Sequence, residues 1–135
     1  MSEENVEAFK RAIEAYNRRD VGGLLEETDP KVEWRGAVQG LLEGEAPIYR
    51  GHAGVRQWMR DIDEALADIR LEFFEISDLG SRLIATGRLR AHGTESKAGV
   101  ESPFGLLVDY RNGKAVRVLS FLDPKEAHEA AGLSE

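Results

Sequence analysis

Three side chains of the sequence are suited to moving a proton beside an apolar pocket: Glu101, His52 and Tyr49. If Glu101 turns inward from its strand-like segment, burial raises the pKa of its carboxyl group and suits it to acid–base work. His52 directly follows Gly51 at the start of a helical segment, and imidazole titrates near neutral pH. Tyr49 is the phenol best placed to donate a hydrogen bond inward. The alternatives are a solvated strand end for Glu101 and a helix-capping position for His52.

A metal site is not predicted. The histidines His52, His92 and His128 lie far apart in the sequence and have no carboxylate at a metal-ligand spacing. The chain has no cysteine, which excludes disulfides and thiolate ligands. A further acid, Asp123, is expected to cap the closing helix. We therefore expect neither a metal nor a cofactor.

The composition is that of a single globular domain spanning 1–135, with 41% hydrophobic and 32% charged residues. The net charge of −7, from 18 Lys+Arg against 25 Asp+Glu, argues against a phosphate-backbone binder, so no nucleic-acid partner is expected. No apolar run approaches the ~18 residues of a membrane helix. The first residues, MSEENVEAFK, lack the basic flank and apolar stretch of a signal peptide. We expect a cytoplasmic protein without a membrane partner.

Hydrophobic periodicity divides the chain into early helices and later strands. The expected helices cover 3–18, 21–27 and 51–67, with a closing helix after Asp123; the expected strands cover 31–36, 69–78, 82–92, 99–110 and 114–122. Helices followed by antiparallel strands predict an α+β domain. Its curved, mostly antiparallel sheet, wrapped around three helices, would form a cone with an internal pocket.

The order of these elements, with the stretches AYNRRDVGGLLE, YRGHAGVRQWM, RNGKAVRVLSFLD and DPKEAHEAAGL in their places, resembles the SnoaL-like proteins. These belong to the nuclear-transport-factor-two-like superfamily, which shares the α+β cone. The resemblance covers nearly the whole chain. It implies the fold but not one function, because the superfamily includes isomerases, polyketide cyclases, epoxide hydrolases and non-catalytic binding domains.

Ketosteroid isomerase, a member of this superfamily, provides the sharpest comparison. Its aspartate base falls on Trp34, and its oxyanion-binding aspartate falls on Gly105. Its donor tyrosine falls on Ala12, and a supporting tyrosine falls on Met59. Enolisation needs a carboxylate base and an oxyanion donor, and no matched position provides either. The resemblance therefore does not extend to steroid isomerisation.

The same matching implies which side chains face the pocket. On the strand 99–110 it turns Glu101, Pro103, Gly105, Leu107 and Asp109 inward. The resulting ligand-binding candidates form an apolar wall with a few polar points: Trp34, Trp58, Met59, Ile62, Gly105, Leu107, Val118, Ser120 and Leu122. The alternative is a filled core in which the two tryptophans plug the cone.

The alternate residues of strand 99–110 would then face outward. They include Phe104, Leu106, Val108 and Tyr110, which are too apolar for a water-exposed surface. We expect a homodimer that buries this outer sheet face. The loop 37–48 is expected to be either a lid over the cone's mouth or a packed extension at the dimer edge.

Three functions remain open at this point. The first is a pocket protein that binds a small, mostly apolar metabolite, cyclic ones included. The second is a cofactor-free cyclase, isomerase or hydrolase that uses Glu101 or His52 as acid or base. The third is a structural dimer whose cone is filled by side chains. The sequence does not identify the ligand or establish that a reaction occurs.

Overall fold

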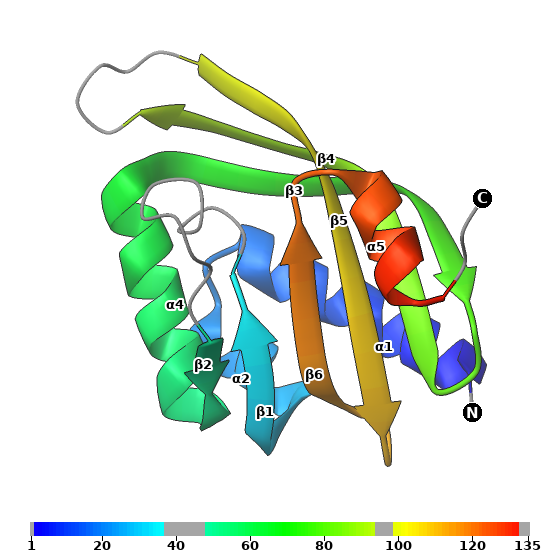
Figure 1. Cartoon of the computed structure of the whole chain (residues 1–135). Coiled ribbons are helices and arrows are strands. Elements are labelled where there is room, and N and C mark those ends of the chain that lie inside the picture. The colour runs from blue at the N-terminus through cyan, green and yellow to red at the C-terminus, as the bar shows by residue number, and fades with distance from the viewer. Residues whose placement is uncertain (1, 37–47, 94–98, 133–135) are drawn as a thin grey trace.

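The computed structural model describes residues 2–36, 48–93 and 99–132 of the chain. Within these ranges, six strands form one curved, unclosed sheet in the order β2-β1-β6-β5-β4-β3 (Figure 1). Neighbouring strands are antiparallel except β1 and β6, which run parallel. In chain order the elements are α1 (Ser2–Asn17), α2 (Val21–Glu26), β1 (Thr28–Arg35), β2 (Ile48–Arg50), α4 (Gly51–Ala65), β3 (Leu66–Asp78), β4 (Arg82–Gly93), β5 (Gly99–Arg111), β6 (Lys114–Phe121) and α5 (Pro124–Ala130).

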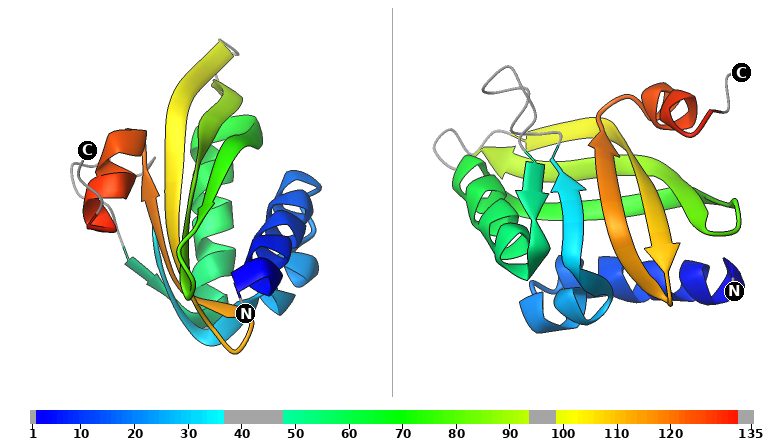
Figure 2. Two further views of the ribbon diagram at one scale, coloured as in Figure 1. Left: turned by 90° about the vertical axis from the view of Figure 1, so that its right-hand side faces the viewer. Right: turned by 60° about the horizontal axis from the view of Figure 1, so that its bottom comes forward.

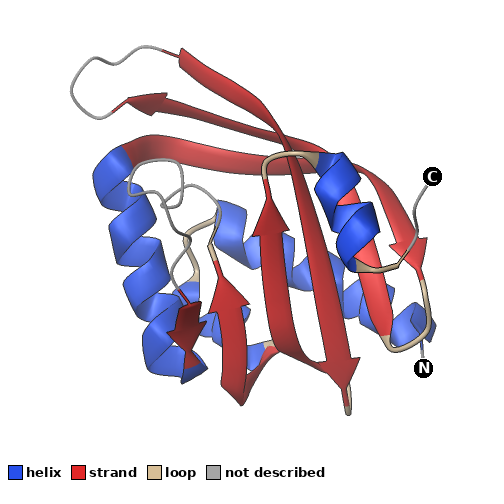
Figure 3. Ribbon diagram, in the orientation of Figure 1, coloured by secondary structure: helices blue, strands red, loops and turns tan. Residues whose placement is uncertain are grey.

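The sheet separates two layers of helix (Figures 2 and 3). Helices α1, α2 and α4 lie against one face, where the main core gathers side chains such as Phe9, Val55 and Leu106. Helix α5 lies against the other face, where Ala127 closes a smaller apolar cluster with Ile84. The described helices include none long and apolar enough to cross a membrane. The predicted α+β cone is therefore confirmed, with α5 as an outer cover.

The predicted helices and strands are confirmed, with small shifts at their ends. Helix α4 ends earlier than predicted because Leu66 already has an extended backbone, and β3 begins at this residue. Strand β2 is not apparent from the sequence because it has only three residues, which pair with β1. Asp123 caps α5 as expected, since its side chain accepts a hydrogen bond from the backbone N–H of Lys125.

The C-terminal end of α1 is tied to β3 by side chains rather than by packing alone. The Asn17 side chain makes two hydrogen bonds of 3.0 Å with the backbone of Leu71, donating to its carbonyl and accepting from its N–H. The Arg19 guanidinium donates to the carbonyl of Ile69 at 3.2 Å. Arg19 itself has a positive φ of 62°, which turns the chain sharply into α2. These contacts hold α1 across the sheet and fix one wall of the interior.

The sequence-based assignment of faces on β5 is wrong. Phe104, Leu106, Val108 and Tyr110 are buried in the main core rather than on an outer surface. The cause is the pairing with β4, because residues directly opposite on neighbouring strands share a face and β4 turns Leu83 and Ala85 into the same core. The four residues therefore cannot form the predicted dimer surface.

The residues expected to face inward on β5 lie on the opposite side, under or beside α5. A Cβ atom on Gly105 would lie 3.3 Å from the Cβ of Ala127. Leu107 belongs to the cluster that α5 covers. Asp109 pairs with Arg82 at 2.8 Å on this same face. The apolar alternation alone indicates the correct face, whereas the register transferred from ketosteroid isomerase reverses it.

We predict that Gly87→Ala is strongly destabilising. Gly87 of β4 lies beside the bulge in β3, and an added Cβ would overlap the carbonyl oxygen of Glu72 and lie 2.7 Å from the Cα of Phe73. Because both are backbone atoms, the strands must separate, at a cost of about 2–3 kcal/mol in the free energy of unfolding. Urea denaturation followed by circular dichroism measures this change.

The matched control is Gly99→Ala, at the start of β5. A Cβ there meets no atom within 4 Å, so its effect should stay within about 0.5 kcal/mol. Equal stability of the two variants would contradict the close strand approach at Gly87.

Candidate ligand-binding site

A cavity of about 40 Å³ lies inside the cone, between the sheet and helices α1, α2 and α4. Its lining is almost wholly apolar and includes Phe9 from α1, Trp58 from α4 and Phe104 from β5. A water molecule needs roughly 10–15 Å³ on this measure. The space therefore matches a few waters, and a larger guest requires the surrounding side chains to move.

Aromatic rings from three elements form one wall of the cavity. The ring centroids of Trp34 on β1 and Trp58 on α4 lie 4.8 Å apart, with an angle of 43° between the ring planes. The centroid of the Tyr16 ring on α1 lies 5.4 Å from that of Trp58. Tilted pairs at such distances are favourable arrangements for aromatic side chains. The wall therefore offers flat apolar surface with polar atoms at its edges.

Three polar atoms around this cavity have no protein partner at good hydrogen-bond geometry: the Tyr16 hydroxyl, the Trp34 indole N–H and the Ser120 hydroxyl. All three residues line the cavity, and each is more than nine-tenths buried. In the part of the chain that the structure describes, no other buried side-chain nitrogen or oxygen lacks a partner. Since leaving one such group unpaired costs about 1–3 kcal/mol, their convergence on one space is the main chemical feature of the interior.

The Tyr16 hydroxyl remains a hydrogen-bond donor over the whole physiological range. Burial raises its pKa to about 12 because the phenolate would lose its hydration. The Arg19 guanidinium, 4.7 Å from the centre of the Tyr16 ring, opposes this shift only in part. The cavity wall therefore presents a neutral phenol.

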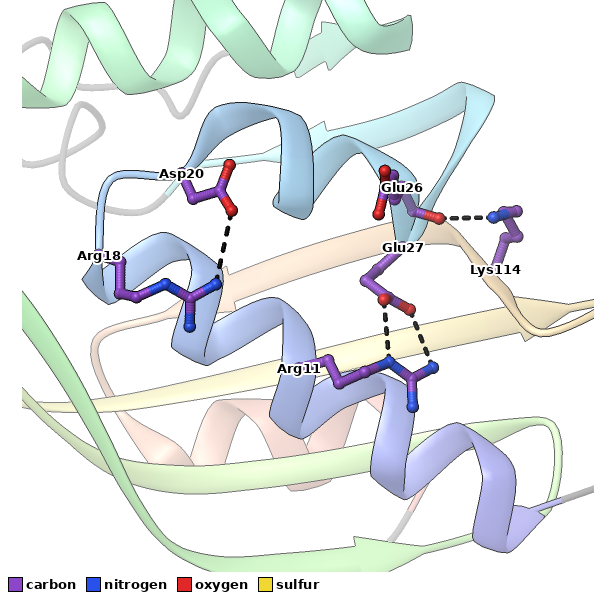
Figure 4. Close-up of polar contacts among 6 residues, drawn as sticks. All are labelled: Arg11, Arg18, Asp20, Glu26, Glu27 and Lys114. Carbon is purple, nitrogen blue, oxygen red and sulfur yellow. Dashed lines mark hydrogen bonds and ion pairs between the residues drawn. The ribbon is translucent and has the colours of Figure 1, made fainter.

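Among the described residues, Glu27 is the one carboxylate in the cavity lining. Glu27 follows α2, and the Arg11 guanidinium on α1 holds its carboxylate with two hydrogen bonds of 3.0 and 3.2 Å (Figure 4). This pairing raises the pKa of Arg11. Neither residue stands out in the sequence, because the two are far apart in the chain and meet only through the angle between α1 and α2.

Four of the predicted ligand-binding residues line the cavity: Trp34, Trp58, Val118 and Ser120. The others lie elsewhere. Met59 and Ile62 are buried in α4 as the helical spacing predicts, but they pack beside the cavity rather than line it. Leu122 is half-buried against the main core, while Gly105 and Leu107 lie on the α5 side of the sheet.

The three candidate catalytic residues are not brought together, and none lines the cavity. Glu101 is exposed on the outer face, with its carboxylate 2.8 Å from the Arg88 guanidinium. His52 lies at the start of α4, where Nε2 is 3.0 Å from the Thr28 carbonyl oxygen. The Tyr49 hydroxyl donates to Asp61 at 2.7 Å. Each side chain has a local structural partner.

Sequence reasoning missed Tyr16 as a site residue, although its place on the apolar face of the first helix is visible from the spacing. That spacing cannot separate a ring that fills the core from one whose hydroxyl is left unpaired. The described residues contain no group of three or more histidines and carboxylates able to hold a metal. The predicted lid covers 37–48, and its residues 37–47 lie outside the described part of the chain.

The chain belongs to the SnoaL-like domain family, whose family model matches residues 9–118. No curated protein matches it significantly. An NTF2-like protein of unknown function from Burkholderia pseudomallei K96243 is similar, with 25% identity, a TM-score of 0.81, and coverage of 93% of this chain and 95% of that one.

Two further solved structures are similar. TerC, co-crystallised with polyporic acid, has 25% identity and a TM-score of 0.79, covering 93% of this chain and 96% of that one. An NTF2-like protein from Burkholderia xenovorans LB400 has 22% identity and a TM-score of 0.74, covering 96% and 97%. The likenesses confirm the superfamily expected from the sequence.

We predict that Tyr16→Phe leaves the free energy of unfolding unchanged or raises it by up to about 1 kcal/mol, because it removes an unpaired buried hydroxyl. Tyr49→Phe is the matched control, since its hydroxyl donates to Asp61; this variant should lose about 1–2 kcal/mol. Urea denaturation followed by far-ultraviolet circular dichroism compares them. A loss in Tyr16→Phe as large as in Tyr49→Phe would mean that the Tyr16 hydroxyl is bonded.

Alkaline pH should destabilise the protein through the same side chain. The folded pKa of Tyr16, about 12, lies above the unfolded value of 10.0, so the unfolded state loses its proton first. Stability is therefore full below about pH 10 and falls as the pH rises through the folded pKa. Between about pH 9 and pH 11.5, Tyr16→Phe should gain about 2 kcal/mol relative to the wild type.

Burial also raises the pKa of Tyr110, with a further contribution from the Glu27 carboxylate. This second tyrosine adds to the alkaline loss in both proteins, so only the difference between wild type and variant reports on Tyr16. A difference that does not change with pH would contradict the raised pKa.

Proposed function

We propose that the interior of the cone binds a small, mostly apolar ligand, cyclic molecules included, that carries at least one hydrogen-bond acceptor. The observation that supports this most strongly is the convergence of three unpaired polar atoms on an otherwise apolar, aromatic-walled cavity. Small-molecule sites have this composition, with apolar walls and a few placed polar groups.

The acceptor follows from the chemistry of the three atoms. The indole N–H of Trp34 can only donate, and the Tyr16 and Ser120 hydroxyls can donate as well as accept. A carbonyl, ether or hydroxyl oxygen of a ligand would satisfy a donor that the folded chain leaves unpaired. The flat faces of Trp34 and Trp58 favour a planar ring system beside that oxygen.

Membership of the SnoaL-like family supports a binding role. TerC, which is similar to this chain at 25% identity, was co-crystallised with a small cyclic molecule, polyporic acid. The cavity of about 40 Å³ favours a single ring and requires some rotation of the aromatic wall to admit it. We propose binding without assigning a reaction.

The other two functions receive less support from the geometry. A cyclase, isomerase or hydrolase that depends on Glu101 or His52 would need one of them at the cavity, and both have partners elsewhere. A cone filled by side chains would leave the three polar atoms without a protein partner. The homodimer stays a prediction, with an interface other than the four buried residues of β5.

We predict that 4-fluorobenzaldehyde binds in the cavity, detected by ¹⁹F NMR, and that Ser120→Ala weakens its binding about five-fold through loss of one hydrogen bond. The matched control is Ser102→Ala on β5, whose hydroxyl donates to the Pro103 carbonyl; it should bind like the wild type. Binding of 4-fluorotoluene, which lacks the acceptor, should be the same in all three proteins. If the wild type binds neither of the two probes, the proposed function is refuted. Native mass spectrometry of copurified ligand gives an independent check.

A further inference from the structure

A surface groove of about 1110 Å³ adjoins the cone at the N-terminal end of α1. It runs between the first turns of α1, the turn at Gly80 and Ser81, and the turn at Asn112 and Gly113. Tyr110 lines both this groove and the interior cavity. The two spaces therefore lie on either side of this side chain.

Side chains separate the groove from the cavity here. Arg11 lines the groove and Glu27 lines the cavity, and their two hydrogen bonds join the two sides (Figure 4). The side chain of Arg11 is 59% exposed and that of Glu27 only 15%. Since solvent and salt screen exposed ion pairs, this pair is easier to separate than the packed core around the rest of the cavity.

The backbone of Glu27 is held in place, so Arg11 is the part able to move. The Glu27 N–H donates to the Leu24 carbonyl, and its own carbonyl accepts from the Ala115 N–H at 3.0 Å. One residue earlier, the Glu26 carbonyl accepts from the Lys114 ammonium at 2.5 Å (Figure 4). These bonds join the end of α2 to the start of β6, whereas the Arg11 side chain extends from the open face of α1.

We propose that small molecules reach the cavity from this groove, past Tyr110, and that the Arg11–Glu27 pair is the gate. The route passes Glu3, Glu4 and Glu7, which also line the groove, and ends at the Glu27 carboxylate. Neutral and cationic molecules pass this gate, and anions are repelled. The inference rests on the proposed function, because a gate matters only if the cavity takes a ligand.

Tryptophan fluorescence measures this access directly. Trp34 and Trp58 are the two tryptophans of the chain, and both line the cavity. The probes are acrylamide, caesium and iodide, which are neutral, cationic and anionic quenchers, compared at constant ionic strength. Arg11→Gln should raise the quenching constants for acrylamide and caesium about two-fold or more and leave iodide at the wild-type level. High salt should raise acrylamide quenching of the wild type toward that of Arg11→Gln and leave the variant unchanged.

The matched control is Arg18→Gln. It removes another exposed pair, Arg18–Asp20 with 3.4 Å between the charged atoms, in the turn between α1 and α2, and neither residue lines the cavity (Figure 4). This variant should be quenched like the wild type. An equal rise in both variants would attribute the effect to general loosening and overturn the gate, as would an unchanged Arg11→Gln or a rise for iodide equal to that for acrylamide.

The quenching result is independent of the aldehyde-binding result. If the wild type fails to bind 4-fluorobenzaldehyde while Arg11→Gln still admits acrylamide selectively, the binding role fails and the gate stands. If the aldehyde binds, Arg11→Gln should exchange it faster in ¹⁹F line shapes with an unchanged dissociation constant. Slower or unchanged exchange would overturn the gate while leaving the binding role intact.

Discussion

The contact between Trp34 and Trp58 joins the sheet to α4, and the shape of the interior depends on it. Trp34 projects from β1 and Trp58 from α4, with ring centroids 4.8 Å apart. Tyr16 of α1 also contacts Trp58, so three elements that are separate in the sequence share one aromatic cluster. Protein interiors are close-packed, with few voids larger than a water molecule, so the cavity of about 40 Å³ beside this cluster is a distinctive feature of the core.

The three polar atoms beside this cluster lack a partner within the protein, which costs stability wherever nothing else bonds them. A core that satisfied the hydroxyls of Tyr16 and Ser120 and the N–H of Trp34 would be more stable on its own. Unsatisfied polar groups are rare in folded proteins, and here they share one lining rather than being scattered. Polar groups placed at a cost to stability, all in one region, are typical of a functional site.

Much of the fold was predictable from the sequence because it follows from periodicity. The apolar face of α4, with Trp58 and Ile62 inward, needs only helical spacing, and the Asp123 cap needs only the residue types beside Pro124. The orientation of β5 required the strand partner to be known, and a register borrowed from a relative misplaced Gly105 and Leu107. The more apolar of the two alternating sets on β5, which includes Leu106 and Val108, was the better guide.

The chemistry of the site was less predictable because it depends on which polar atoms lack a partner and on the angle at which two helices meet. Spacing places Tyr16 in the core but cannot show that its hydroxyl lacks a partner. The pairing of Arg11 with Glu27 depends on how α1 and α2 meet, which no local pattern encodes. Glu101 and His52 illustrate the converse, since residue types suited to catalysis turned out to have structural partners.

The parallel pairing of β1 with β6 also affects how the protein is made. The pairing joins Trp34 to Val118 and Arg35 to Leu119, so one side of β1 has no strand partner until β6 has been synthesised. Contacts between such distant segments form slowly, because a long loop must close before they contribute any stability. During translation the first two helices and β1 therefore expose apolar surface until the later strands cover it, and this is a stage at which the nascent chain needs protection from aggregation.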